Sequence, residues 1–147
     1  MIRIFIAGDK HGFKAIQYVK EYLDSKKLEY VDLGVKNETE EIVLEKMIPP
    51  VVKGVLENEA NRGILSCGTG IGVEIGVNKF SGIRACLATN ETLAEWASVY
   101  DKCNVLCLVG WNCNRVQIFK MLEKWLGSKY DGDKRRLKTF EEFDKWY

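Results

Sequence analysis

Short apolar stretches alternate with longer amphipathic segments along the whole chain, and this alternation limits the possible folds more than any other feature. Strands are predicted for the apolar stretches, at about residues 2–7, 28–33, 63–66, 83–89 and 105–109. Apolar residues at helical spacing predict helices at about residues 12–26, 42–57, 73–80, 90–101 and 116–126. Strands that alternate with helices form a parallel sheet covered by helices on both faces. We therefore expect an α/β fold with a five-stranded parallel sheet.

One predicted helix contains an internal conflict. Pro49 and Pro50 fall in the middle of residues 42–57. Proline lacks a backbone N–H and disfavours helical geometry in the residue before it. We therefore expect this helix to break or kink near Ile48.

Composition excludes several classes of protein. Lys and Arg total 22 against 21 Asp and Glu, a net charge of +1 that argues against a general nucleic-acid binder. No apolar run approaches the roughly 18 residues of a membrane span, and the first residues lack the pattern of a signal peptide. Five cysteines without a CxxC pair, beside a single histidine, disfavour a metal site. We expect a metal-free protein with reduced thiols in the cytoplasm.

The strongest candidate site is the segment Cys67–Gly72, directly after the third predicted strand. In parallel sheets, ligands bind outside the carboxyl ends of the strands. Three glycines within five residues allow backbone N–H groups to converge on an anion or a developing oxyanion. Cys67 at the start of this turn lies where a thiol can serve as a base or nucleophile. The alternative is a tight turn around a buried cysteine.

A second candidate loop, Gly8–Gly12, follows the first strand. It brings together a carboxylate on Asp9, an ammonium on Lys10 and the imidazole of His11. Asp9 could instead cap the helix that begins near Gly12. His11 could equally be an exposed loop residue.

The tail at residues 128–147 is polar and basic first and aromatic later, and we expect it to be helical. A run of cations such as this one usually forms a solvent-exposed surface, although cations three or four residues apart can also bind a phosphate together. Its aromatic end is too apolar to remain in water, so we expect it to pack on this chain or on a partner subunit. The cations are Lys134, Arg135, Arg136 and Lys138, and the aromatic residues are Phe140, Phe143, Trp146 and Tyr147.

In their order along the chain and in their residues, these segments resemble the ribose-5-phosphate isomerase B family, which includes the galactose-6-phosphate isomerase subunits. The resemblance runs from about Met1 to Lys138, within a single domain of residues 1–147. Its most specific part is Gly63–Gly72, which continues through Val77-Asn78-Lys79-Phe80 to Gly82-Ile83-Arg84-Ala85. Further matches are Asn104-Val105-Leu106, Trp125-Leu126-Gly127 and Tyr130-Asp131-Gly132.

The resemblance implies a Rossmann-like three-layer sandwich that isomerises a phosphorylated sugar through an enediolate without a cofactor or metal. The activity it implies is of the ribose 5-phosphate/ribulose 5-phosphate type. It also implies a homodimer or homotetramer with active sites at the subunit interface. Neither nucleic acid nor a membrane is an expected partner.

The resemblance also assigns roles to individual residues. Cys67 is the base that moves a proton between C1 and C2, and Tyr100 occupies the position of the ring-opening histidine. Thr69 and Asp9 contact sugar hydroxyls, and backbone N–H groups of the glycine turn stabilise the enediolate. The other expected substrate-binding residues are Lys10, His11, Gly68, Gly70, Ile71, Gly72, Asn104, Lys134, Arg135 and Lys138.

Three departures from the family pattern affect these roles. Lys10 replaces a histidine in the first loop, Tyr100 replaces the ring-opening histidine, and Trp111 replaces an arginine after the fifth strand. A tyrosine hydroxyl can donate a proton at pH 7 but is a poor base. The proton-transfer residues are retained, whereas the ring-opening residue and part of the phosphate-binding set have changed. Trp111 and Tyr100 predict a more apolar and smaller pocket.

Three interpretations remain open. The chain is a homo-oligomeric isomerase with an altered substrate, such as a tetrose 4-phosphate that cannot form a furanose ring. It is the cysteine-loop subunit of a hetero-oligomeric galactose-6-phosphate isomerase, paired with a paralogous subunit. Or it is a non-catalytic protein that binds sugar phosphates. Glu74 is a distant second candidate for the base and is expected to be a solvated helix residue.

Overall fold

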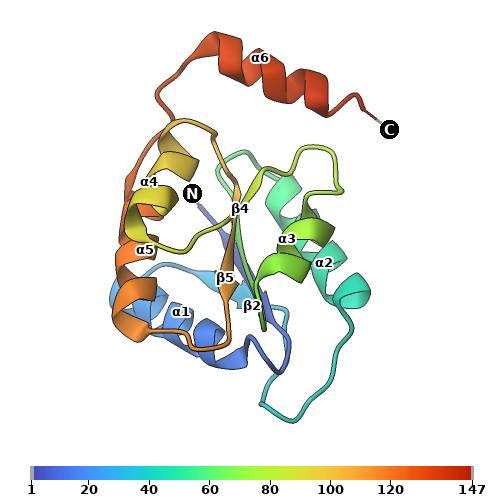
Figure 1. Cartoon of the computed structure of the whole chain (residues 1–147), viewed down its shortest axis with the longest axis vertical. Helices are drawn as coiled ribbons and strands as arrows, with labels where there is room; N and C mark the ends of the chain where they lie inside the picture. The colour runs from blue at the N-terminus through green and yellow to red at the C-terminus, as the bar shows by residue number, and fades with distance from the viewer. Residues whose placement is uncertain (1, 147) are drawn as a thin grey trace.

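The structure, a computed structural model, describes residues 2–146. Met1 and Tyr147, the last of the tail aromatics, lie outside the described residues. Strands and helices alternate as predicted, with one further helix in the tail (Figure 1). The strands are β1 (Ile4–Gly8), β2 (Tyr30–Asp32), β3 (Arg62–Cys67), β4 (Ala85–Leu87) and β5 (Val105–Val109). The helices are α1 (Phe13–Ser25), α2 (Leu44–Leu56), α3 (Ile71–Val77), α4 (Glu91–Val99), α5 (Arg115–Gly127) and α6 (Lys134–Phe143).

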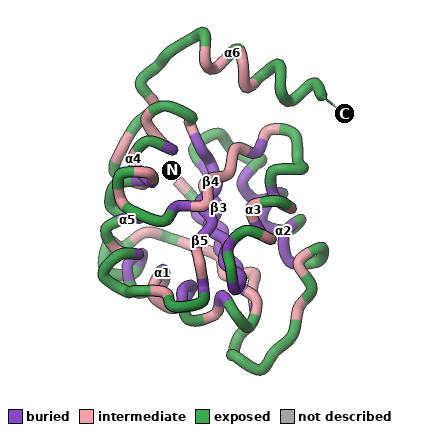
Figure 2. Tube along the Cα trace, in the orientation of Figure 1, coloured by how far each residue is buried: buried purple, intermediate pink, exposed green. Residues whose placement is uncertain are grey.

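The five strands form one parallel sheet in the order β2-β1-β3-β5-β4. Helices α1, α4 and α5 cover one face of the sheet, and α2 and α3 cover the other (Figure 1). Successive residues of β1 face opposite layers: Ile4 and Ile6 pack toward α1, whereas Phe5 and Ala7 pack toward α2. Burial on both faces explains why β1 and β5, inside the sheet, are continuously apolar (Figure 2). The predicted three-layer α/β sandwich is confirmed.

Helix α2 is not broken near Ile48, which corrects that part of the prediction, whereas a kink there stays a prediction. The helix runs without interruption from Leu44 to Leu56 and contains both prolines. Pro49 and Pro50 lie on its exposed side, while Met47, Ile48, Val51 and Val52 on the opposite side are buried in the core. Packing of this apolar face against the sheet outweighs the hydrogen bonds that the prolines cannot make, since tertiary contacts dominate helix stability in proteins.

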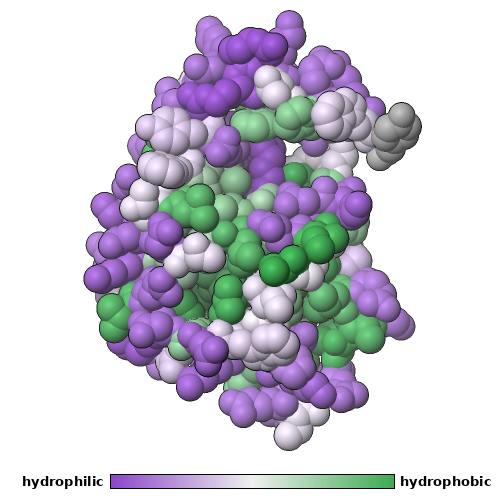
Figure 3. Space-filling view, viewed as in Figure 1, coloured by the Kyte–Doolittle hydropathy of each residue, from purple (hydrophilic) through white to green (hydrophobic). Residues whose placement is uncertain are grey.

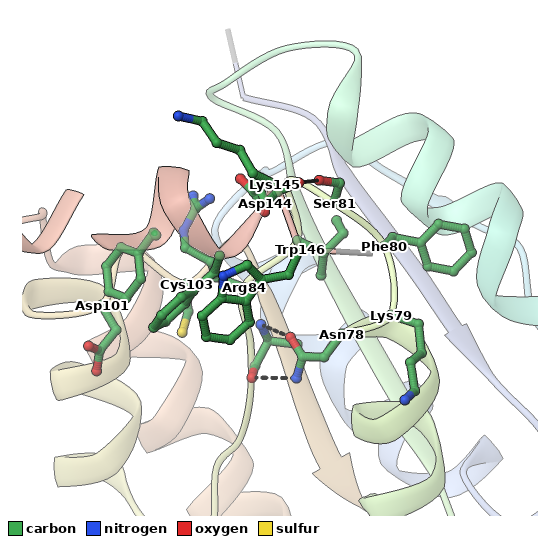
Figure 4. Close-up of a pocket in the computed structure, with 14 residues that line it drawn as sticks. Asn78, Lys79, Phe80, Ser81, Arg84, Asp101, Cys103, Asp144, Lys145 and Trp146 are labelled. Carbon is green, nitrogen blue, oxygen red and sulfur yellow. Dashed lines mark hydrogen bonds between the residues drawn. The ribbon is translucent and has the colours of Figure 1, made fainter. Parts of the chain in front are cut away.

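The tail crosses one end of the molecule as a strap (Figure 1). Helix α6 has no buried residue (Figure 2). Hydrogen bonds hold both ends of α6. At its start Arg136 donates to the Tyr100 carbonyl, and after its end Asp144 accepts from Ser81 and Gly82. Phe140, Phe143 and Trp146 contact one another and line a cavity of about 760 Å³ beneath the strap (Figure 4). Phe143 and Trp146 remain 46% and 67% exposed, so the packing of the aromatic end on the rest of this chain or on a partner stays a prediction.

Gly54 provides a test of how tightly α2 packs on the sheet. A Cβ atom at this position would lie 2.5 Å from the Phe5 ring. Gly54→Ala should therefore lower the free energy of unfolding by about 1–3 kcal/mol, although alanine favours helices by about 1 kcal/mol over glycine.

The matched control is Gly127→Ala at the end of α5, where a Cβ would meet nothing within 4 Å. Urea unfolding of both variants compares a crowded glycine with an open one. Equal or higher stability of Gly54→Ala would show that α2 shifts freely on the sheet.

Candidate active site

The glycine turn begins at Cys67, the buried last residue of β3. Gly70 has a φ of +75° and directly precedes α3. A Cβ at Gly70 would lie 2.8 Å from the Leu108 carbonyl oxygen and 2.5 Å from Leu87 Cδ1. Both the positive φ and the lack of space require glycine here. The predicted tight turn at the carboxyl end of a central strand is therefore present.

Polar side chains of the two candidate loops are fixed by their own backbones. The Thr69 hydroxyl accepts a hydrogen bond from Ile71 N–H at 3.1 Å. Asp9 Oδ1 accepts from His11 N–H at 3.0 Å and from Gly12 N–H at 2.9 Å. Asp9 thus holds its loop closed ahead of α1, whose N-cap residue is Gly12 and has no side-chain cap. Both side chains are held in place at the carboxyl edge of the sheet.

The loops after β1, β3 and β5 meet at this edge. Gly110 N–H donates to the Cys67 carbonyl at 2.8 Å. A Cβ at Gly110 would lie 2.2 Å from the His11 carbonyl oxygen, and one at Gly12 would lie 2.2 Å from the Ser66 carbonyl oxygen. Backbone atoms of the three loops therefore approach one another closely, which brings Asp9, His11 and Cys67 into one region.

Trp111 covers part of this region. Its backbone N–H donates to the Gly68 carbonyl at 2.9 Å. Its indole lies on Gly68, where a Cβ would be 2.5 Å from Trp111 Cε2. Indole Nε1–H also donates to His11 Nδ1 at 3.4 Å, and the two rings meet edge to face with centroids 5.6 Å apart. The sequence identifies Trp111 as a departure from the family pattern, but no feature of the sequence predicts its contact with His11.

A cavity of about 510 Å³ opens beside these loops. Lys10 Nζ lies 2.8 Å from Glu41 Oε1 at its rim, and this hydrogen bond raises the pKa of Lys10 and lowers the pKa of Glu41. A Cβ at Gly72 would lie 3.1 Å from Leu44 Cδ1 and 3.8 Å from Cys67 Sγ, so the thiol lies beside Gly72 at the start of α3. The cavity is lined by Asp9, Lys10, His11, Glu41, Ile42, Val43 and Lys46.

The remaining predicted site residues lie at the opposite edge of the sheet (Figure 1). Tyr100 ends α4, and Asn104 directly precedes β5. The Asn104 amide accepts from Arg84 N–H and donates to the Gly82 carbonyl. Within this chain these residues do not approach Cys67, and their contact with a substrate stays a prediction. The residues at this amino edge are Tyr100, Asn104, Lys134, Arg135 and Lys138.

Glu74 corrects the prediction of a solvated helix residue. Its side chain is half-buried, and Oε2 accepts a hydrogen bond from the Leu87 backbone N–H. Glu74 therefore joins α3 to the end of β4. The sequence showed only a carboxylate on a short amphipathic helix and could not reveal this contact.

Burial raises the pKa of the four thiols that lie outside the glycine turn. Burial raises the pKa of Cys86 to about 11 and that of Cys103 to about 12. Burial also raises the pKa of Cys107 and of Cys113. All five cysteines are free, as predicted. Among residues 2–146, no group of His, Cys, Asp or Glu side chains is arranged to hold a metal ion.

Comparison with known proteins decides the family. The family model described as Ribose/Galactose Isomerase matches residues 4–142. The chain belongs to this family. Within the range that the structure describes, no helix combines the length and apolar character needed to cross a membrane. The predicted resemblance and the class of activity, an aldose–ketose isomerase, are confirmed.

Individual relatives cover nearly the whole chain. Ribose-5-P isomerase B of Listeria innocua is 30% identical over 146 residues, 98% of each chain. The 4-deoxy-4-sulfo-D-erythrose isomerase of Clostridium sp. (strain MSTE9) is 29% identical over 153 residues, 96% of each chain. The structure of ribose-5-phosphate isomerase B from Mycoplasma genitalium with bound ribulose-5-phosphate matches with a TM-score of 0.90 and 30% identity. That match covers 99% of this chain and 98% of the other.

The raised thiol pKa values predict a loss of stability at alkaline pH. A cysteine in the unfolded chain ionises near pH ~8.5, whereas Cys103 in the folded chain ionises at about 12. Between these values the unfolded state binds fewer protons, so the free energy of unfolding falls as pH rises. The slope is at most about 1.4 kcal/mol per pH unit for each thiol.

Urea unfolding of Cys103→Ala from pH 8 to 11 should give a shallower slope than the unmodified chain gives. Lysine and tyrosine ionise over the same range in both proteins, so the comparison isolates the thiol. Identical slopes would contradict the pKa assigned to Cys103.

Proposed function

We propose that this protein interconverts the aldose and ketose forms of a short phosphorylated or similarly anionic sugar, with Cys67 as the base. The observation that carries the proposal is the position of Cys67 at the start of a glycine turn at the carboxyl edge of the sheet, with its Sγ beside Gly72. A base must lie within hydrogen-bond reach of the proton it removes, and this edge is where open α/β sheets bind ligands. The reaction needs a reduced thiol, so we place the protein in the cytoplasm.

In the proposed reaction, the Cys67 thiolate removes the proton from C2 of the aldose. The C2–H electron pair forms the C1–C2 double bond, and the carbonyl electron pair moves to O1 as an enediolate. The thiol returns a proton to C1, and the O2 hydroxyl proton transfers to O1, which leaves a ketone at C2. Backbone N–H groups of Gly70 and Gly72 stabilise the oxyanion. Ile71 N–H already donates to Thr69, so its role is to hold the Thr69 hydroxyl toward the sugar.

A second copy of the chain completes the proposed site. The amino-edge cations Lys134, Arg135 and Lys138 point to an anionic substrate group, because clustered cations bind phosphate strongly. They cannot meet Cys67 of their own chain, since α6 lies at the other end of the sheet. Exposed apolar side chains on α3, Ile71 and Ile75, fit burial against another subunit (Figure 3).

A four-carbon substrate fits the departures in this chain. Trp111 covers Gly68 and narrows the turn, and Tyr100 is a poor base for ring opening. A four-carbon sugar whose O4 is esterified, or whose C4 carries a sulfonate in place of the hydroxyl, has no free 4-hydroxyl to close a furanose ring. Such a sugar needs no ring opening. The relative from Clostridium sp., named for a four-carbon sulfonated sugar, supports this substrate class. The alternatives are a subunit that requires a paralogous partner and a non-catalytic sugar-phosphate-binding protein.

Isotope exchange tests the proposal. The purified chain is incubated in D2O with four-, five- and six-carbon aldose and ketose phosphates and with 4-deoxy-4-sulfo-D-erythrose. Proton NMR at C1 and C2 should show exchange and interconversion, fastest with a four-carbon substrate. Cys67→Ala should slow both by about 10²–10⁴-fold, because it removes the base.

Cys113→Ser is the matched control, since it changes a half-buried thiol in the loop after β5. It should retain wild-type rates. Exchange that persists in Cys67→Ala would exclude Cys67 as the base. Absence of exchange and interconversion with every sugar tested would favour a missing partner subunit or a binding protein.

A further inference from the structure

Resting on the function proposed above, we propose that His11 and Trp111 act as one unit in substrate binding. In this unit the Trp111 indole N–H fixes His11 as a neutral ring with its proton on Nε2. His11 then donates Nε2–H to an oxygen of the sugar, and Trp111 is a positioning residue that does not itself contact the reacting atoms.

Trp111 is held rigidly enough for this role. Its backbone N–H and that of Gly110 both donate to the Gly68 carbonyl, at 2.9 and 3.1 Å. Its ring rests on the Cα of Gly68, where no side chain intervenes. An indole anchored through both its backbone and its ring has few alternative rotamers, although 54% of the residue is exposed. Its Nε1–H therefore points in a fixed direction.

The direction of the hydrogen bond determines the state of His11. Indole Nε1–H can only donate, so His11 Nδ1 must accept and cannot carry a proton. The single proton of the neutral ring then lies on Nε2. The backbone of His11 is fixed as well, because its N–H donates to Asp9 Oδ1 and its carbonyl packs against Gly110. Backbone and ring are thus both held.

His11 Nε2–H is suited to a sugar oxygen. His11 lines the 510 Å³ cavity together with Asp9 and with Lys10, whose ammonium is paired with Glu41. The carboxylate of Asp9 accepts hydrogen bonds, so the neutral ring supplies a donor that the carboxylate cannot. A neutral donor also binds an oxygen without competing with Cys67 for the substrate proton. The arrangement separates hydrogen-bond donation from proton abstraction.

NMR of the single histidine tests the pair without relying on turnover. Selective ¹⁵N labelling of His11 reports Nδ1 and Nε2 individually, because the chain contains one histidine. Trp111→Phe keeps a ring on Gly68 but removes the donor, so the Nδ1 resonance should shift. Trp96→Phe, which alters an exposed tryptophan on α4, should leave it unchanged. Saturating erythrose 4-phosphate or ribose 5-phosphate should move Nε2 in the unmodified chain.

A double-mutant cycle on kcat/KM tests the coupling. Trp111→Phe should lower kcat/KM about 3- to 10-fold, the effect of one neutral hydrogen bond, and His11→Ala should lower it at least about tenfold. The double variant should be no slower than His11→Ala alone, since Trp111→Phe keeps a ring on Gly68 and removes only the donor to His11. Additive losses would overturn the proposal.

The two proposals fail in different ways. An Nδ1 resonance unchanged in Trp111→Phe, with wild-type turnover intact, refutes the pair and leaves the isomerase. An Nε2 resonance that neither sugar phosphate moves refutes His11 as a substrate contact. Absence of Cys67-dependent exchange in the unmodified chain refutes the proposed function, and the Nδ1 comparison still decides whether the pair exists.

Discussion

The common direction of the five strands is the constraint on which the rest of the structure depends. Because every strand is parallel, the loops that follow β1, β3 and β5 all emerge at one edge of the sheet. That edge carries Cys67, Asp9 and His11, whereas Tyr100 and the cations of α6 lie at the other. Chemistry that needs both groups cannot be completed within one chain. The proposed function therefore requires a second subunit for a geometric reason.

Close backbone contact makes the carboxyl edge possible. A methyl group at Gly12 or Gly110 would overlap a carbonyl oxygen of a neighbouring loop, and one at Gly68 would overlap the Trp111 ring. These glycines let the three loops approach closely, and they leave room for the Trp111 ring on Gly68, at the entropic cost that glycine brings to the unfolded chain. The same packing fixes the Trp111–His11 pair. Precise loops and a positioned histidine are thus consequences of one local constraint.

The sequence predicted the features that depend on periodicity and local spacing. The bounds of β5 match the structure because burial on both faces leaves a direct signal, and clustered glycines correctly mark the turn after Cys67, although α3 already begins at Ile71. It failed at α2, where buried side chains far apart in the sequence outweigh two prolines. The sequence also did not predict the hydrogen bond between Glu74 and Leu87 or the contact between Trp111 and His11. These contacts join residues that are 13 and 100 positions apart. Long-range contacts between single polar groups have no periodic signature.

The central claim is that the Cys67 edge of one copy and the amino-edge cations of another form one active site. Mixing two inactive variants, Cys67→Ala and the double variant Lys134→Ala/Lys138→Ala, tests it most directly. Each mixed dimer would contain one site with both defects and one intact site, so subunit exchange at equal amounts should restore about a quarter of the unmodified activity. Activity of the mixture that stays at the level of the separate variants would contradict the shared site.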